Sequence, residues 1–364
     1  MENKDVFAVI MAGGKGERFW PQSRASRPKQ LLRLVGDLTM IEQTVNRLKN
    51  LMPAGNIMVI TNTDYVAPMQ SLLGDLPANN IIGEPCGRDT APCVALAAAL
   101  VGAKTDNPDA VMVVLPADHV INDTEAMVNV LNDCAEVAAG GKIVTIGVNP
   151  DFPSTGYGYI KCEEPIDTGL KTNFYCSGGF QEKPDLQTAE KFISDGCYKW
   201  NSGMFAWSVS TIMSAFEKHA PNLAEGAEIL KKAVFDGDFD EKLITQYNAF
   251  EKISIDYAVM EKVNNVVVAE CAFDWDDVGS WTALRNQIPP TEDNNVVRGL
   301  HVGLDTKDCI IFGDNNHLIS TIDVDDLIIV HTEDATLVCK SESAQRIKEI
   351  VHLLADKPEL KGFI

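Results

Sequence analysis

The chain has 364 residues, enough for two domains at about 150 residues per domain. Hydrophobic residues make up 45% and charged residues 23%, which are ordinary values for a globular protein and exclude disordered and collagen-like chains. The chain has 31 basic and 52 acidic residues and a net charge of −21. So acidic a chain is a poor candidate for broad binding to nucleic acid or to anionic membranes, and we expect neither partner.

The start of the chain and its cysteines predict a cytoplasmic protein. Met1–Asp5 leads into only six apolar residues before Gly13 and Gly14, which is not the pattern of a signal peptide. No apolar run approaches the roughly 18 residues that a membrane span needs. The nine cysteines are scattered and include no CxxC pair, so we expect neither a disulfide framework nor a structural zinc site.

Short apolar runs alternate with helical patterns in the first half of the chain, which predicts a Rossmann-like, doubly wound α/β sheet. The predicted strands are Val6–Met11, Asn56–Thr61, Ala110–Leu115 and Lys142–Gly147. The predicted helices are Met40–Leu51, Ala91–Ala103 and Glu125–Ala139. Ligands bind such sheets at the carboxyl ends of the strands, so loops that directly follow these runs are candidate sites.

The rest of the chain predicts further strands in the same sheet and then a second, small domain. From about residue 150 to 290 the pattern loosens, and we expect mixed strands that extend the sheet, with helices near Val209–Lys218 and Leu223–Val234. Pro289–Asn295 is typical of a linker. Beyond it, aliphatic pairs separated by Asp, Asn and Gly turns predict a few β-solenoid coils, followed by a helix over Ser343–Ala355. We therefore expect a catalytic domain over residues 1–288 and a short β-solenoid-like domain over residues 295–364.

A glycine loop rich in cations follows the first predicted strand. Consecutive glycines let backbone N–H groups approach an anion closely. The spacing of the glycines does not fit a Walker A loop. A dinucleotide-binding GxGxxG motif that begins at Gly14 would have Phe19 at its third glycine position, where a small residue is needed for close packing. Residues 15–33 contain six cations and one acid, Glu17, which gives a net charge of +5 in a strongly acidic chain. This loop therefore predicts a polyphosphate site; the cations are Lys15, Arg18, Arg24, Arg27, Lys29 and Arg33.

Two groups of acids are candidate metal ligands. Asp118 follows the strand Ala110–Leu115, and the segment Phe273–Trp281 contains three acids in four residues, Asp274, Asp276 and Asp277. Magnesium bound together with a nucleotide usually needs only one or two protein carboxylates, so Asp118 and Asp277 would suffice. His119 is more typical of a structural residue, and the sequence has no GxSxG nucleophile motif.

The motifs together resemble those of the nucleoside-diphosphate-sugar pyrophosphorylases, and more narrowly those of the bacterial mannose-1-phosphate guanylyltransferases. Nine blocks carry the resemblance in order, over about residues 6 to 285: Val9–Pro21, Arg27–Leu31, Glu84–Pro92, Leu115–His119, Gly156–Tyr159, Phe180–Pro184, Trp200–Met204, Ser254–Glu261 and Asp277–Trp281. The resemblance implies transfer of GMP from GTP to mannose 1-phosphate, giving GDP-mannose and pyrophosphate. It also implies a homodimer that is built through the C-terminal domain.

The resemblance also implies a role for each site residue. Arg18 and Lys29 would act on the reacting phosphates, and Asp118 and Asp277 would hold Mg²⁺. Nucleotide-binding residues would be Ala12, Gly13, Gly14, Lys15, Gly16, Glu84, Pro85, Gly87, Arg88 and Thr90. Sugar-phosphate-binding residues would be Gly158, Glu182, Lys183, Asn201 and Gly203.

The sequence departs from the family pattern at two positions, Asp89 where an Asn is expected and Cys93 where a small residue is usual. Many bacterial relatives also carry an isomerase domain, which we do not expect here. Three alternatives stay open: the same chemistry on another sugar 1-phosphate or nucleotide, a catalytically silent regulatory subunit of the same fold, and a nicotinamide-dependent dehydrogenase.

Overall fold

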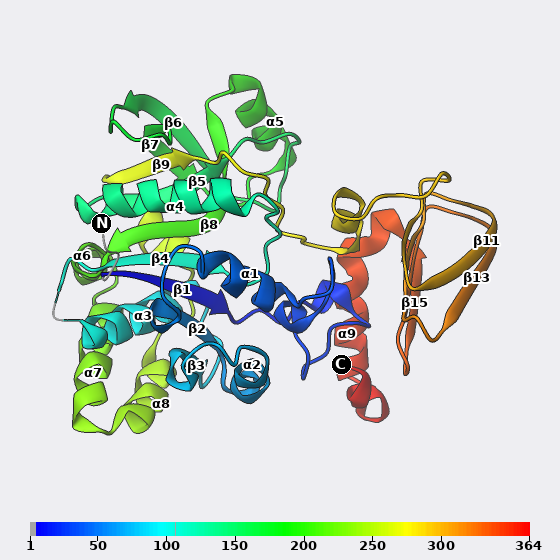
Figure 1. Cartoon of the computed structure of the whole chain (residues 1–364), viewed down its shortest axis with the longest axis horizontal. Helices are drawn as coiled ribbons and strands as arrows, with labels where there is room; N and C mark the ends of the chain where they lie inside the picture. Colours follow the sequence, from blue (N-terminus) through cyan, green and yellow to red (C-terminus); the bar gives the residue numbers. More distant parts are fainter. Residues whose placement is uncertain (1–4, 106) are drawn as a thin grey trace. The chain divides into compact units, whose positions relative to one another are not determined.

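A computed structural model describes residues 5–105 and 107–364 of the chain (Figure 1). Residues 1–4, which belong to the segment for which no signal peptide is expected, lie outside the described residues. The chain forms two compact units, which we describe one at a time. The first comprises Met1–Gly13, Val45–Ala117 and Ile121–Trp275, and the second comprises Gly14–Thr44, Asp118–Val120 and Asp276–Ile364. The domain boundary expected near residues 288–295 stays a prediction.

The first unit contains a nine-stranded mixed sheet, which confirms the predicted fold class. The strands follow one another across the sheet in the order β3-β2-β1-β4-β8-β5-β9-β7-β6. Strands β3, β2, β1 and β4 are parallel neighbours, whereas β8 runs antiparallel to β4 and β5. The bounds are β1 Val6–Ala12, β2 Ile57–Asn62, β3 Ile81–Glu84, β4 Val111–Pro116, β5 Ile143–Val148, β6 Tyr159–Ile166, β7 Phe174–Gln181, β8 Tyr198–Ser208 and β9 Val266–Glu270.

Helices cover both faces of this sheet, as expected for a doubly wound fold. Helix α4 packs on β4, β5 and β8, whereas α3 packs on β1 and β4 together with α6 and α7 (Figure 1). The bounds are α1 Met40–Leu48, α2 Val66–Leu72, α3 Thr90–Lys104, α4 Thr124–Ala139, α5 Leu186–Asp195, α6 Val209–His219, α7 Pro221–Asp236 and α8 Phe239–Ala249.

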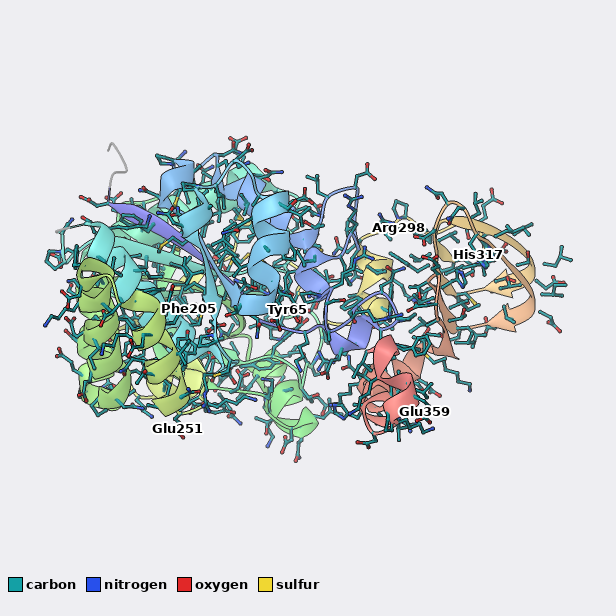
Figure 2. The ribbon with its side chains drawn as sticks, turned by 90° about the horizontal axis from the view of Figure 1, so that it is seen from below. Tyr65, Phe205, Glu251, Arg298, His317 and Glu359 are labelled. Atoms are coloured by element: carbon teal, nitrogen blue, oxygen red, sulfur yellow. The ribbon has the colours of Figure 1, made fainter. Side chains whose placement is uncertain are left out.

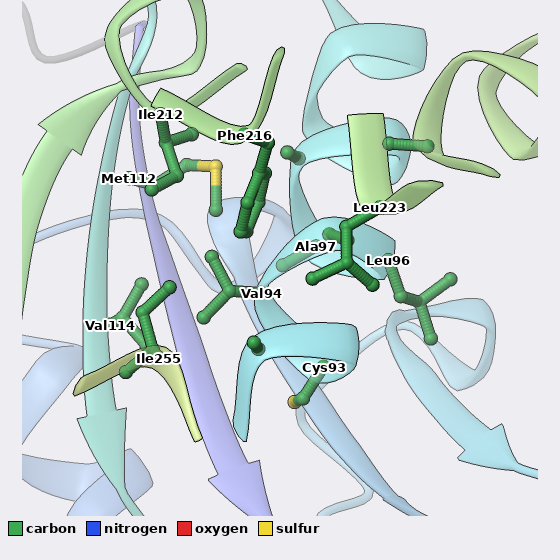
Figure 3. Packing of buried hydrophobic residues seen from close by; sticks show 14 of the residues in the cluster. Cys93, Val94, Leu96, Ala97, Met112, Val114, Ile212, Phe216, Leu223 and Ile255 are labelled. Carbon is green, nitrogen blue, oxygen red and sulfur yellow. The ribbon is translucent and has the colours of Figure 1, made fainter. Parts of the chain in front are cut away.

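Alternate residues of the central strands form the main core on the α3 side. Because successive side chains of a strand point to opposite faces, Met112 and Val114 of β4 face the same layer. Figure 3 shows them with Val94 of α3 and Phe216 of α6. Helix α3 is rich in buried alanine, and its small side chains let α7 pack closely against it. This core fixes the carboxyl ends of β1, β3 and β4, where the predicted site residues begin.

The second unit contains a short β-helix, which confirms the predicted solenoid. Strands β10, β12 and β14 are parallel neighbours, and β11 and β13 form a second parallel pair. Paired residues such as Ile310 and Ile328 lie 18 positions apart, which is one coil. Figure 2 labels Arg298, the last residue of β10, and His317, which directly precedes β13. The bounds are β10 Val296–Arg298, β11 Leu300–Lys307, β12 Ile310–Phe312, β13 Leu318–Asp325, β14 Leu327–His331 and β15 Thr336–Lys340.

Aspartates in left-handed backbone conformations recur once per coil of the β-helix. Asp305 and Asp308 have positive φ, and so do Asp323 and Asp326, each one coil later. Aspartate tolerates this region better than most residues because its short side chain can hydrogen-bond locally. The recurring acidic positions in the sequence are therefore places where the backbone of successive coils takes the same left-handed conformation.

The terminal helix, α9 (Ile347–Ala355), begins later than the predicted Ser343, because residues 341–346 form a 3-10 helix. Its Ile347 belongs to a buried cluster with Phe19, Trp281 and Phe312. The ring centroids of Phe19 and Trp281 are 5.2 Å apart, and those of Trp281 and Phe312 are 4.9 Å apart. The segment after the glycine loop thus shares one core with the C-terminal segment. No helix in the described part of the chain is both long and apolar enough to cross a membrane.

Candidate active site

The glycine loop is held in place by Lys29. Gly16 has a φ of +66°, and a Cβ added to it would lie 2.3 Å from Cβ of Lys29. Only glycine tolerates both the left-handed backbone and this close approach. The loop leads into a single 3-10 turn, Glu17–Phe19, so no long helix begins here to supply a dipole. Lys29 itself begins a second 3-10 turn, Lys29–Leu31.

A cavity of about 380 Å³ in the second unit brings together several predicted residues. Lys29 is only 6% exposed, and its Nζ donates to Oδ2 of Asp118 at 2.8 Å and to the carbonyl oxygen of Asp277 at 2.6 Å. The lysine therefore links the two acids that the sequence analysis proposes as metal ligands. The cavity is lined by Lys15, Gly16, Glu17, Arg18, Phe19, Lys29, Asp118, His119, Asp277, Gly279 and Lys348.

The charge of Asp118 is stabilised by this arrangement. Burial alone would raise the pKa of the Asp118 carboxyl, but the Lys29 ammonium and His119 outweigh it and hold the pKa below its ordinary value. Asp118 is thus an ionised carboxylate in a partly enclosed position at neutral pH. Oxygen donors of this kind suit a hard divalent cation.

The structure separates the three clustered acids of residues 274–277. The Asp274 carboxylate accepts from the backbone N–H groups of Asn122 and Asp123, within the first unit. The Asp276 carboxylate accepts from the Val278 N–H at 2.7 Å and from the Gln287 side chain at 3.0 Å, within the second unit. These two acids hold the backbone, and Asp277 is the one that lines the cavity. Val278 has a φ of +44°, which is unusual for a β-branched residue and reflects the sharp turn after Asp277.

The six cations of the glycine-loop segment do not form one patch. Lys15, Arg18 and Lys29 line the cavity, and Arg18 donates to the Gly279 carbonyl at 3.4 Å. Arg24 instead pairs with Asp334 at 2.8 Å. Arg27 and Arg33 are exposed and do not line the cavity, so half of the basic run has other surroundings. The cavity gains a cation that the sequence analysis did not find, Lys348 of α9. Nothing in the sequence around Lys348 indicates that this residue lies close to the glycine loop in the folded chain.

A second group of predicted residues lies in the first unit, around Glu84 at the end of β3. Glu84 is 6% exposed, and its Oε1 accepts from the Tyr247 hydroxyl at 2.9 Å. A Cβ added to Gly13 would lie 3.3 Å from the other oxygen, Oε2. Burial raises the pKa of Glu84 to about 7, against the hydrogen bond from Tyr247, which lowers it. Tyr247 is a neighbour of Glu84 that the sequence motifs do not indicate, because it lies in α8 outside every motif.

The loop that follows Glu84 is fixed to residues 247–255. Arg88 donates from Nε to the Tyr247 carbonyl at 2.9 Å, so its guanidinium caps the end of α8. The Thr90 hydroxyl accepts from the Ile255 N–H at 2.8 Å. Asp89, the departure from the family pattern, has a φ of +69°, and its side chain accepts from the Thr90 N–H. Arg88 and Thr90 thus hold the loop, in which Pro85 lies at a bend and Gly87 lies outside any helix or strand. Ala12 ends β1, and its carbonyl accepts from Thr61 at 2.9 Å.

The predicted sugar-phosphate residues lie together in the first unit. A Cβ added to Gly158 would lie 2.4 Å from Oε2 of Glu182, so only glycine leaves that carboxylate its place. Lys183 pairs with Oε1 of Glu182 at 2.6 Å. The backbone N–H of Asn201 donates to the Gly158 carbonyl at 2.8 Å. The side-chain oxygen of Asn201 accepts from the Gly203 N–H at 3.3 Å.

Asp256 completes this group, although the sequence analysis did not select it. It lies in a π-helical turn, Asp256–Met260, and its Oδ1 accepts from the Asn201 amide at 3.1 Å. Burial and the nearby Glu182 carboxylate raise the pKa of Asp256 to about 6. Single π-turns recur at functional sites. Asp256 lies within the block Ser254–Glu261 that carries the resemblance, but the resemblance implies no role for this residue.

The residues present fit a magnesium ion that is bound together with phosphates. Asp118 and Asp277 line one cavity, and the described residues contain no group of three or more His, Cys, Asp or Glu side chains that would form a metal site alone. Two carboxylates leave coordination positions for phosphate oxygens and water, as Mg²⁺ prefers.

Comparison with known proteins identifies the family of both parts of the chain. The nucleotidyl transferase family model matches residues 7–294. The model described as "MannoseP isomerase/GMP-like beta-helix domain" matches residues 299–354. The chain is thus a nucleotidyltransferase that carries a C-terminal β-helix domain.

Individual relatives show to which group of nucleotidyltransferases the chain belongs. Mannose-1-phosphate guanylyltransferase 2 of Escherichia coli O157:H7 is 36% identical over 360 residues, which cover 97% of this chain and 74% of the relative. Mannose-1-phosphate guanylyltransferase of Klebsiella pneumoniae is 39% identical over 353 residues, which cover 96% and 74%. A crystal structure from Thermus thermophilus, described as a mannose-1-phosphate geranyltransferase, is 34% identical with a TM-score of 0.87 and covers 96% of this chain and 99% of its own. The chain therefore belongs to the mannose-1-phosphate guanylyltransferases of the nucleotidyl transferase family.

Proposed function

We propose that the chain transfers GMP from GTP to mannose 1-phosphate and releases pyrophosphate. Membership of the family supports the reaction, and the observation that carries it is the Lys29 ammonium held between Asp118 and Asp277 in a cavity lined by further cations. An oxygen of the sugar phosphate attacks the α-phosphorus of GTP. One P–O bond forms there, and the bond to the β-phosphate breaks, so the pyrophosphate leaves with the electron pair.

The chain's own residues would mainly position and neutralise the reactants. The attacking oxygen is already anionic, so no general base is required, and the main obstacle is the approach of two anions. Lys29 would neutralise charge at the α-phosphate, and Arg18 would do so at the neighbouring phosphates. The N–H groups of Gly14, Lys15 and Gly16 would bind phosphate oxygens. Asp118 and Asp277 would hold Mg²⁺, which neutralises phosphate charge when bound.

Glu84 supports guanine as the base. The ionised Glu84 carboxylate, which prevails above its pKa of about 7, only accepts hydrogen bonds, and guanine offers N–H donors on the edge where adenine offers an acceptor. The Tyr247 hydroxyl on Oε1 leaves Oε2, on the Gly13 side, as the oxygen that would meet the base. The sequence alone implies the choice of base only through the family resemblance. The structure adds Glu84 as a candidate residue for selecting guanine.

Two carboxylates support a sugar as the second substrate. Glu182 and Asp256 can both accept bonds from sugar hydroxyls, and Gly158 permits close backbone approach to a ring. Lys183 and the Asn201 amide supply the donors that a phosphate requires.

We also propose a homodimer that forms through the C-terminal domain. The paired strands β11 and β13 expose an apolar face, whose side chains are 48% to 68% exposed: Leu300, Val302, Leu304, Leu318 and Ile322. A second copy of the chain would cover this face. Sedimentation should give a dimer for the unchanged chain and a monomer for Val302→Asp. A monomer in both cases would refute the proposal.

Pyrophosphate release, measured with four nucleoside triphosphates and several sugar 1-phosphates, tests the function. We expect turnover to be fastest with GTP and mannose 1-phosphate. Faster turnover with another pair of substrates would support nucleotidyl transfer but contradict GTP and mannose 1-phosphate as the substrates. The absence of turnover with every pair, and of pyrophosphate exchange, would favour a silent regulatory subunit. Binding of NAD would instead favour a dehydrogenase.

A further inference from the structure

The cation that the C-terminal helix adds to the cavity has no role in the function described so far. Lys348 lines the cavity together with Lys15, Arg18 and Lys29, although it lies more than 300 residues after them in the sequence. It is exposed, so its ammonium group is accessible from solvent.

Packing fixes the backbone of Lys348 relative to the glycine loop. Its neighbour Ile347 is 2% exposed in the core that also contains Phe19. One turn further along α9, Nε2 of His352 lies 3.7 Å from Oε2 of Glu17. The indole N–H of Trp20 also donates to the Phe363 carbonyl at 2.7 Å, which anchors the residues after α9. Lys348 therefore projects from a helix that is held against the loop by both apolar and polar contacts.

The charges of the cavity divide into two groups. Lys29 is paired with Asp118 and bonded to Asp277, so its ammonium lies among the residues proposed to act at the α-phosphate. Within the described part of the chain, Lys15 and Lys348 form no ion pair with a carboxylate. These cations are available for an anion from outside the protein. The pyrophosphate half of a nucleotide carries most of the negative charge of the triphosphate.

We propose that Lys348 binds the β- and γ-phosphates of the nucleotide and, after transfer, the pyrophosphate product. The inference rests on the proposed function, and it assigns the C-terminal helix a binding role in addition to a structural one. Because the side chain is exposed, its attraction for the phosphates is screened by salt. Its removal should weaken pyrophosphate binding about tenfold, the scale of one hydrogen bond to a charged group.

The test compares Lys348→Ala, Lys348→Arg and the control Lys357→Ala in the full chain. Lys357 is also exposed in the C-terminal segment but does not line the cavity. We expect Lys348→Ala to raise KM for GTP, and KM for pyrophosphate in the reverse reaction, about tenfold. KM for mannose 1-phosphate should not change, Lys348→Arg should restore most of the loss, and Lys357→Ala should resemble the unchanged chain.

Calorimetry with inorganic pyrophosphate and Mg²⁺ separates this inference from the proposed function, because it needs no turnover. Weaker binding by Lys348→Ala than by Lys357→Ala, at an equal Tm, supports the inference even if the substrate pair is a different one. Equal binding by the two variants overturns it, whether or not the unchanged chain makes GDP-mannose. A loss that Lys348→Arg does not reverse, or an equal rise in KM for all substrates, also overturns it.

Discussion

The Lys29 ammonium lies 2.8 Å from Oδ2 of Asp118, a residue 89 positions away in the chain. This pair joins the basic loop to one of the two acids proposed to hold a metal ion. Replacing Lys29 by Ala removes the cation proposed to act at the α-phosphate. We expect the turnover rate to fall by at least roughly a hundredfold, the scale of losing one stabilising donor in such sites.

The control for Lys29→Ala is Lys49→Ala. Lys49 also pairs with a carboxylate, Asp75 at 2.7 Å, but its side chain is 31% exposed and that of Asp75 is 80% exposed. Steady-state pyrophosphate release should be unchanged in this variant, since exposed ion pairs contribute little. Near-normal turnover of Lys29→Ala, with its fold intact by circular dichroism, would refute the role of Lys29.

The sequence predicts this pair in part. Asp118 follows a strongly apolar run, so the sequence predicts it directly after a strand, and the structure places it two residues after β4. The sequence predicts a phosphate site in the basic run. It does not predict that Arg24 forms an ion pair with Asp334, or that Arg27 and Arg33 do not line the cavity. The neighbours of Tyr247, Asp256 and Lys348 could not be predicted, because tertiary packing and not local spacing brings these residues to Glu84, to Asn201 and to the cation-lined cavity, respectively.

Gly16 and Gly14 provide a matched pair in the glycine loop. Gly16 has a positive φ, and an added Cβ would collide with Lys29, whereas a Cβ on Gly14 would meet nothing within 4 Å. Gly16→Ala should therefore displace Lys29 and lower both the activity and the Tm. Gly14→Ala should leave the Tm unchanged. Thermal unfolding and initial rates would measure the difference; equal effects of the two variants would contradict the proposed packing.

Asp277 and Asp276 should respond differently to substitution. Asp277→Asn removes a charged oxygen ligand, so the Mg²⁺ concentration for half-maximal rate should rise and the rate should fall. Asp276→Ala removes the acceptor for the Val278 N–H, and its main effect should be a loss of about 1 to 3 kcal/mol of stability. A Mg²⁺ titration of Asp277→Asn that matches that of the unchanged chain would show that Asp277 is not a ligand.

Glu84 makes the stability of the fold depend on pH. Burial raises its pKa to about 7 from the ordinary 4.5, so the folded state binds a proton more tightly than the unfolded chain does. Its contribution to the free energy of unfolding should fall as the pH rises from 4.5 through 7, by about 3 kcal/mol in total. Glu84→Gln should abolish this part of the pH dependence in denaturant titrations.

Glu251→Gln, at an exposed position, is the control for Glu84→Gln. It should leave the pH dependence of stability as it is. If Glu84→Gln leaves it unchanged as well, Glu84 is ionised at its ordinary pKa and the description of its surroundings is wrong.

Asp256 should affect the sugar substrate and not the nucleotide. We expect Asp256→Asn to raise KM for mannose 1-phosphate roughly tenfold at pH 8, where the native side chain is ionised, without changing KM for GTP. Because the pKa of Asp256 is about 6, with Glu182 and Lys183 as its charged neighbours, the two proteins should converge as the pH falls to 5. The sugar phosphate also titrates near pH 6, so the ratio between the proteins is the quantity to measure.

Asp240→Asn, at an exposed position in α8, is the control for Asp256→Asn and should leave both KM values unchanged. A KM ratio between Asp256→Asn and the unchanged chain that stays constant from pH 8 to pH 5 would mean that the charge of Asp256 does not reach the sugar.

A crystal structure of the full chain with Mg²⁺ and a GTP analogue that cannot be cleaved between its α- and β-phosphates tests the account most directly. We expect the triphosphate in the cavity lined by Lys15, Arg18 and Lys29, with the cation bound by Asp118 and Asp277. Phosphates bound at any other place, with that cavity empty of ligand, would contradict the proposed mechanism.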